Sequence, residues 1–239
     1  MTGEIIDGSR RQAAKVVGWS YLLALVPAIF AELFARGRLI VADDAARTAM
    51  NVVAHQRLFR LGIACNLAVA AIDIALITAL YIVLGPVHRR VALLATGWGL
   101  IETGALVAAT LTDFDVLRFL SDAPYVKAFE PDRLQSLARL SIGAHGMAYI
   151  VCLIFAGLRS TAFCSLWLRS RLVPRPLALL GVAASAFMGA CAFSFVVFPE
   201  LANVIPVPVY GGPIFLFELS MGFWLVGKGL PPDPAMPAN

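Results

Sequence analysis

The chain has 239 residues, of which 60% are hydrophobic and 14% are charged, and its formal net charge is +4. Because soluble domains carry about 25% charged residues, this composition excludes a single soluble core and predicts one compact membrane domain. The basic residues do not alternate with aromatic residues along a surface segment, so we expect no nucleic-acid partner.

Six apolar segments are long enough to cross a bilayer, which requires about 20 mainly apolar residues. The first follows Arg10, Arg11 and Lys15 and is predicted to be an uncleaved signal-anchor helix. The predicted spans are 16–36, 58–84, 91–112, 137–168, 174–198 and 206–228. We therefore predict an all-α polytopic membrane protein, with a single transmembrane helical domain over residues 1–230 and a disordered, proline-rich tail over residues 231–239.

Two connections between the spans are predicted to have structure of their own. Asp43 and Asp44 begin a helical pattern that runs to His55, with the acids favourably placed at its start. Residues 113–136 mix aromatic and charged side chains, which predicts an interfacial loop or a short amphipathic helix. The expected architecture is thus a six-transmembrane-helix bundle with short interfacial helices in the outer loops.

The basic residues near the ends of the spans predict the orientation, because cytoplasmic loops are enriched in lysine and arginine. In a six-helix count the following residues fall on one side: Arg10, Arg11, Lys15, Arg89, Arg90, Arg169, Arg171, Arg175 and Lys228. The arginines between residues 36 and 60 depart from this rule. We predict a multi-pass protein of the cell inner (plasma) membrane with both termini in the cytoplasm.

Four acidic or histidine side chains lie deep in the predicted spans: Asp73, Glu102, His145 and Glu218. With a helical rise of about 1.5 Å per residue, Glu102 lies roughly 16 Å from its cytoplasmic entry and Glu218 at a similar depth from the outer side. A charge near the membrane centre costs at least about 2.5–3.5 kcal/mol. We therefore interpret these four residues as candidate catalytic groups.

Other residues are candidates for binding a substrate beside those groups. They are Asn66, Trp98, Gly99, Ser141, Tyr149 and Gly222. Ser141, His145 and Tyr149 repeat every four residues and make one polar stripe, while the glycines allow close helix contact or leave room for a ligand. We expect a central cavity that joins Asn66, Glu102, His145 and Glu218 and opens toward the outer half of the membrane.

Simpler interpretations apply to several of these groups. Buried polar side chains can join helices by hydrogen bonds without any further role. Glu32 and Asp113 lie near the predicted ends of their spans, where solvated charges at the rim of the bundle are expected. The four cysteines lie inside apolar segments without metal-ligand spacing, so we expect no disulfide, metal or other cofactor.

Several short stretches together resemble a known family over nearly the whole chain. The stretches are Asp44–Asn51 with Leu58–Gly62, Leu80–Tyr81 with Pro86–Val87, His145–Tyr149, Pro174–Arg175 with Leu180–Gly181, and Glu218–Ser220 with Trp224–Gly229. They resemble the bacterial membrane family called domain of unknown function 4386. The resemblance implies the fold and the positions of Asp73, Glu102, His145 and Glu218, and it implies no activity.

The chain departs from that family's pattern in the third helix. The pattern has Phe-Arg-Leu, a hydrophobic residue and Glu, where this chain reads Trp98-Gly99-Leu100-Ile101-Glu102. An acid often stands at the position of Asn66, and an aspartate near Gly189. The loss of the arginine leaves Glu102 without its expected counter-ion, so we expect Glu102 to hold a proton at neutral pH.

Three functions are compatible with these features. The first is an intramembrane enzyme that uses buried carboxyl groups for acid–base chemistry on a lipophilic substrate, such as isoprenoid or terpenoid cyclisation, isomerisation or a lyase reaction. The second is a proton-linked carrier of a small molecule, and the third is a non-enzymatic membrane binding or assembly subunit. The expected partners are a lipophilic small molecule and membrane lipid, whereas the oligomeric state is not predicted.

Overall fold

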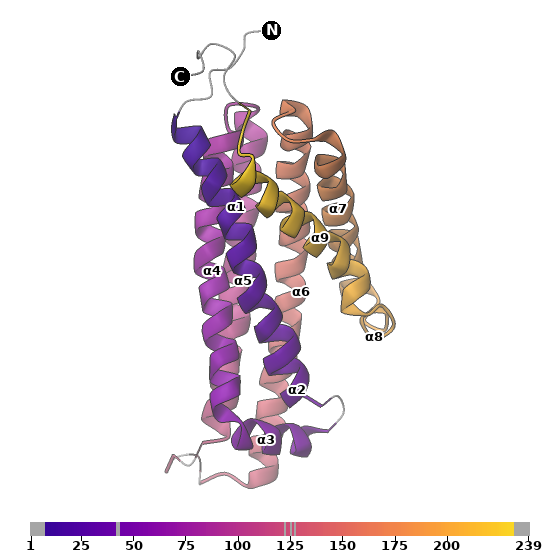
Figure 1. Cartoon of the computed structure of the whole chain (residues 1–239). Coiled ribbons are helices and arrows are strands. Elements are labelled where there is room, and N and C mark those ends of the chain that lie inside the picture. The colour runs from indigo at the N-terminus through magenta and orange to yellow at the C-terminus, as the bar shows by residue number, and fades with distance from the viewer. Residues whose placement is uncertain (1–7, 42–43, 122, 125, 127, 232–239) are drawn as a thin grey trace. The chain divides into compact units, whose positions relative to one another are not determined.

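The structure is a computed structural model that describes residues 8–41, 44–121, 123–124, 126 and 128–231. These residues are mostly helical, and short connections join the helices (Figure 1). In chain order they are α1 (Gly8–Ile29), the π-helix η1 (Phe30–Arg36), α2 (Gly37–Leu39), α3 (Ala45–Ala54), α4 (Gln56–Leu84), α5 (Arg89–Phe119), α6 (Pro131–Ser170), α7 (Arg175–Val197), α8 (Leu201–Val204) and α9 (Val207–Gly227).

The six predicted spans are confirmed, because six helical segments within the described residues are long and apolar enough to cross a membrane. The first of these is the continuous run Gly8–Leu39, made of α1, η1 and α2. Helices satisfy every backbone polar group internally, which is why apolar sequence of this length folds as helix in a bilayer. Pro174 and Pro206 precede α7 and α9, where a proline costs no helical hydrogen bond. The chain is an all-α, multi-pass membrane protein.

The connection before α4 folds as predicted. Asp44 caps α3, and its side chain accepts a hydrogen bond from the backbone N–H of Arg47 at 2.8 Å. In Figure 1, α3 lies nearly crosswise to the start of α4. Asp43 lies outside the described residues, as does the predicted tail except for Pro231.

The connection predicted over residues 113–136 is shorter in the structure, so the prediction is wrong at both ends of that segment. Helix α5 continues to Phe119 and α6 begins at Pro131, so only the residues between them form the connection. The helix extends because Val116 and Leu117 are buried in an apolar core with Phe59 and Ile142. This packing continues the helical periodicity past Asp113, where the uninterrupted apolar run ends.

The chain divides into two compact units, each of which takes part of the long helices. Unit 1 comprises the described residues of Met1–Leu25, Ile72–Glu102 and Leu153–Asn239, and unit 2 comprises those of Val26–Ala71 and Thr103–Cys152. The core of unit 1 contains Trp167, Phe163 and Phe217. In unit 1, α7 also packs along α9 (Figure 1).

Glycines bring helices of unit 1 into close contact. A Cβ on Gly157 of α6 would lie 2.6 Å from the Cα of Gly189 on α7, so these two helices meet backbone to backbone. A Cβ on Gly222 of α9 would lie 2.7 Å from the Cγ of Leu22 on α1. Small residues at such contacts are typical of packing between membrane helices. Gly222 therefore serves helix packing and leaves no room beside it for a ligand.

Candidate functional site

Three carboxyl groups of unit 1 gather around Arg159 of α6. We call Asp73 of α4, Glu102 of α5, Arg159 and Glu218 of α9 the Arg159 cluster. Arg159 is 4% exposed and Glu102 is 5% exposed. The Nη2 atom of Arg159 donates a hydrogen bond to Oε1 of Glu102 at 2.9 Å, and its Nε contacts Oε2. Both carboxylate oxygens of Glu102 therefore lie against the guanidinium, one of them through a hydrogen bond.

Gly99 makes the path of the Arg159 side chain possible. A Cβ at position 99 would lie 2.8 Å from the Cδ of Arg159 and 2.7 Å from the Cγ2 of Ile77. The space beside this glycine is therefore filled by protein side chains. The expectation that Glu102 lacks a counter-ion is wrong, because Arg159 takes that role from α6.

The other two carboxyl groups of the cluster are less tightly held. The charge of Arg159 acts on both Asp73 and Glu218, and neither carboxyl has a hydrogen bond or ion pair among the described residues. Asp73 is buried, whereas Glu218 is half-buried. One guanidinium thus faces three carboxyl groups. With two protons bound, this cluster would be neutral. Neutrality is favoured because net charge is costly in an apolar interior.

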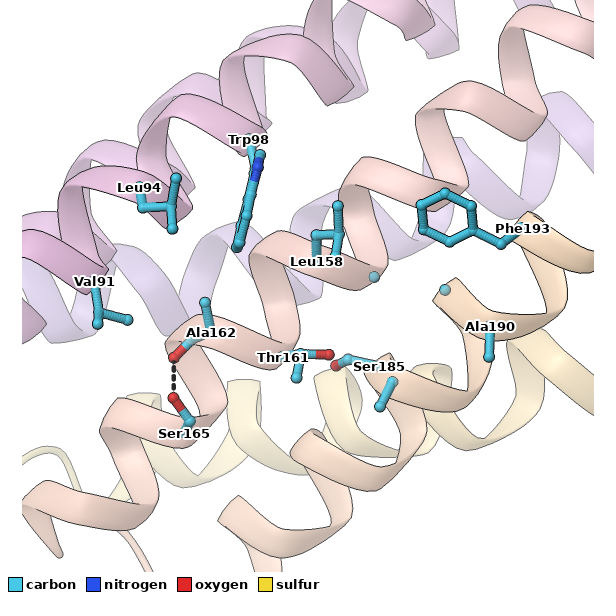
Figure 2. Close-up of a pocket in the computed structure, with 13 residues that line it drawn as sticks. Val91, Leu94, Trp98, Leu158, Thr161, Ala162, Ser165, Ser185, Ala190 and Phe193 are labelled. Carbon is cyan, nitrogen blue, oxygen red and sulfur yellow. Dashed lines mark hydrogen bonds between the residues drawn. The ribbon is translucent and has the colours of Figure 1, made fainter.

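An apolar groove of about 430 Å³ lies on the same unit, between α5, α6 and α7 (Figure 2). Trp98 and Phe193 form two of its walls, and Gly157 and Gly189 line its base. The polar side-chain groups among its lining residues are the hydroxyls of Thr161, Ser165 and Ser185 and the indole N–H of Trp98. In Figure 2, Thr161 of α6 and Ser185 of α7 turn toward each other. The volume falls within the range of about 300–1,000 Å³ that is typical of small-molecule sites.

The hydroxyl groups of the groove differ in what they already bond. Ser165 donates to the carbonyl of Ala162 at 2.7 Å, and Ser185 donates to that of Gly181 at 2.6 Å. Thr161 has no hydrogen bond within the described part of the chain. The groove therefore suits a molecule that is mostly apolar and carries few polar groups.

A second set of ionisable groups lies in unit 2. We call Glu32, Arg36, Asn66, Asp113 and His145 the His145 network. Arg36 Nη1 donates to Asp113 Oδ1 at 2.6 Å, and His145 Nδ1 lies 3.0 Å from Asp113 Oδ2. Asn66 Nδ2 donates to Glu32 Oε1 at 3.3 Å. The network thus ties η1, α4, α5 and α6 together within unit 2.

The π-helix places the two charged residues of η1 on this network. Glu32 and Arg36 are four residues apart, and Arg36 Nε lies 3.7 Å from Glu32 Oε2. Pro27 precedes η1 by less than a turn and cannot donate to the carbonyl of Leu23, which disturbs the helical ladder. Such π-helical segments are frequent at functional sites.

The chain matches the family described as Domain of unknown function (DUF4386) over residues 16–229. The chain belongs to this family. No curated protein and no solved structure matches it. Membership in DUF4386 assigns no activity to the clusters described above.

The candidate residues of this DUF4386 chain fall into two groups. Asp73, Glu102 and Glu218 lie together in unit 1, and Trp98 of the same unit lines the groove. Asn66 and His145 lie in unit 2, where the Tyr149 ring stacks on the His145 ring at a centroid distance of 6.1 Å. Ser141 is half-buried one turn before His145.

The sequence pattern does not predict where three charged side chains lie in the structure. The pattern predicts a solvated rim charge at Asp113, but its side chain is 3% exposed because α5 continues past it. Arg36 is an exception to the charge rule in the sequence, and its side chain is only 12% exposed. Arg159 is absent from the predicted site, although a single arginine in the middle of a long apolar run is itself a signal.

Proposed function

We propose that this protein is an intramembrane enzyme that performs acid–base chemistry on a lipophilic substrate. The observation that carries the proposal is the Arg159 cluster, in which three carboxyl groups share one guanidinium inside an apolar membrane unit. Packing does not require such a cluster, because apolar residues of similar volume are often as stable as a buried ion pair. Carboxyl groups that can hold protons in a dry site are suited to proton transfer.

The contacts suggest different roles for the carboxyl groups. Glu102 is held by Arg159 and serves as the carboxylate that accepts a proton from the substrate. Glu218 is half-buried and holds no competing hydrogen bond among the described residues, so it serves as the acid that donates a proton. Proton donation to an alkene, epoxide or carbonyl followed by proton loss to Glu102 leaves the total number of protons unchanged. The cycle closes when the proton taken up by Glu102 returns to Glu218. Asp73, which holds the second proton of the neutral cluster, relays it by giving its own proton to Glu218 and taking the one on Glu102.

The lining of the groove indicates the class of substrate. Its walls are apolar, and it lies beside the helical turns that carry the cluster: Trp98 precedes Glu102 by one turn, and Leu158 adjoins Arg159. A molecule with an isoprenoid body and one reactive double bond, epoxide or carbonyl fits this lining. Cyclisation, isomerisation and elimination of such molecules all proceed by proton transfer, so the proposal covers these three reaction types.

Occupancy of the groove can be tested with two substitutions on one helix. Ala190 lines the groove and Ala183 is exposed elsewhere on α7. Native mass spectrometry of protein purified from membranes should detect a bound apolar molecule in the wild type and in Ala183→Phe. The signal should be lost in Ala190→Phe. Equal occupancy in both variants would show that the apolar molecule does not bind in this groove.

The roles of the acids can be tested by conversion of a panel of isoprenoid alkenes, epoxides and ketones in proteoliposomes. Glu218→Gln and Glu102→Gln should abolish conversion, because glutamine keeps the size of the side chain but can neither donate the proton as Glu218 does nor accept it as Glu102 does. The control is Glu130→Gln, at an exposed residue outside unit 1. If a folded Glu218→Gln or Glu102→Gln variant retains full activity, that carboxyl group is structural.

A proton-linked carrier is the second candidate. The observation that favours it is that no described residue lining the groove carries a carboxyl group. Protonation of the Arg159 cluster would then alter how α5 and α6 enclose the bound molecule, without changing the molecule itself. Proton-gradient-dependent movement of an unaltered compound into proteoliposomes would favour this function over the enzyme.

A further inference from the structure

The two nitrogen atoms of the His145 ring have different surroundings. The residue is 1% exposed. Its Nδ1 lies 3.0 Å from the backbone oxygen of Ala109 and 3.0 Å from Oδ2 of Asp113. Both neighbours are hydrogen-bond acceptors, so Nδ1 must carry a hydrogen. The ring is therefore either the neutral tautomer with its hydrogen on Nδ1 or the imidazolium with hydrogens on both nitrogens.

The Nε2 atom faces a carboxylate. It lies 3.7 Å from Oε1 of Glu32, is buried, and has no hydrogen-bond partner within the described part of the chain. In a neutral ring with a hydrogen on Nδ1, the lone pair of Nε2 would point toward this carboxylate and repel it. A proton on Nε2 turns the repulsion into attraction.

A proton on Nε2 also balances the charges of the network. The groups that face His145 are Glu32 and Arg36 from η1, Asp113 from α5 and the Tyr149 ring from α6. Asn66 of α4 reaches the network through Glu32 and is neutral. Two carboxylates therefore face one guanidinium, and the imidazole supplies the second positive charge when both of its nitrogens carry hydrogens.

We propose that Glu32 and the Nε2 atom of His145 form a proton-binding site that holds one proton in the His145 network. Glu32 is the more exposed of the two groups, because its side chain is 24% exposed whereas that of His145 is 1% exposed. The bound proton joins the π-helix η1 to α6 in unit 2. The site is separate from the Arg159 cluster of unit 1, so it stands whether or not the proposed acid–base chemistry is correct.

Nitrogen-15 NMR of histidine-labelled protein in nanodiscs tests this site directly. The chain has three histidines, and His55 and His88 are both exposed. In the His55→Gln/His88→Gln background every signal comes from His145. At pH 7 both nitrogens should be protonated in this background. Glu32→Gln should remove the proton from Nε2 and leave the one on Nδ1, whereas Glu130→Gln should change neither signal.

Glu32→Asp provides a second variant that keeps the carboxylate and should retain the proton on Nε2. The proposal is overturned if Nε2 is unprotonated at pH 7 in the background protein, a measurement that needs no change at Glu32. It is also overturned if a folded Glu32→Gln variant gives an unchanged spectrum. Replacement of Na⁺ by K⁺ should have no effect, and a Na⁺-dependent Nε2 signal would mean that the site holds a metal cation instead.

Discussion

Replacement of Arg159 by methionine should destabilise the protein strongly. Methionine keeps an unbranched side chain that fits past Gly99, where the Cδ of Arg159 now lies. It leaves Glu102, which is 5% exposed, without the guanidinium that bonds it. The Arg159 cluster then contains three carboxyl groups and no cation. Its remaining charge has to be neutralised by protons or drawn toward water, and both cost free energy.

The geometry sets the size of this effect. At an effective dielectric constant of about 20, opposite unit charges at the 2.9 Å that separates Nη2 from Oε1 attract by about 6 kcal/mol. Part of this attraction offsets desolvation, and removal of one partner of a buried pair typically costs about 3–5 kcal/mol. We expect a loss in this range for Arg159→Met. Glu102→Gln should cost less, because Asp73 and Glu218 remain in electrostatic range of Arg159.

A double-mutant cycle measured by reversible unfolding in bicelles isolates the pair. The double variant Arg159→Met/Glu102→Gln should be more stable than the sum of the single losses predicts, by about 2–3 kcal/mol. The control cycle uses Arg133 and Glu130, whose side chains are 75% and 82% exposed, and its coupling should not exceed about 0.5 kcal/mol. Additive losses within about 0.5 kcal/mol at Arg159 and Glu102 would refute the account of this pair.

Two further predictions concern packing and orientation. Gly157→Ala should destabilise the protein by about 1–3 kcal/mol in the same unfolding assay, because its Cβ would meet the Gly189 backbone. Gly104→Ala, whose added Cβ would lie in open space, should stabilise it by about 0.5–1 kcal/mol, and equal effects would contradict the close contact of α6 and α7. In a background without the four native cysteines, Asp132→Cys should react with an impermeant thiol reagent in intact cells. His88→Cys should react only after permeabilisation, and reaction in intact cells would reverse the proposed orientation.

The membrane spans could be predicted from the sequence because they depend on local hydropathy and length. The start of α3 was predictable for a similar reason, since Asp44 bonds a backbone N–H only three residues away. The end of α5 was not, because the buried positions of Val116 and Leu117 depend on contacts with Phe59 of another helix. Hydropathy locates an apolar run, whereas tertiary packing decides how far the helix continues.

The partners of the buried charges could not be predicted in the same way. Arg159 and Glu102 are 57 residues apart, and Arg36 and Asp113 are 77 residues apart. Depth along a span is readable from the sequence, but the direction in which a side chain points depends on how the helices are rotated. In η1 the π-helical ladder also changes the rotation of Glu32 and Arg36, which a regular helical period cannot anticipate.

The most direct test of the proposed acid–base chemistry is solvent deuterium incorporation. Protein loaded with an isoprenoid alkene, which an acid protonates on carbon, would be incubated in D₂O, and the extracted molecule analysed by mass spectrometry for deuterium bound to carbon. The account predicts incorporation by the wild type and by Glu130→Gln, and none by Glu218→Gln. A bound molecule that gains no carbon-bound deuterium with the wild-type protein, or that gains it equally with Glu218→Gln, would contradict the account.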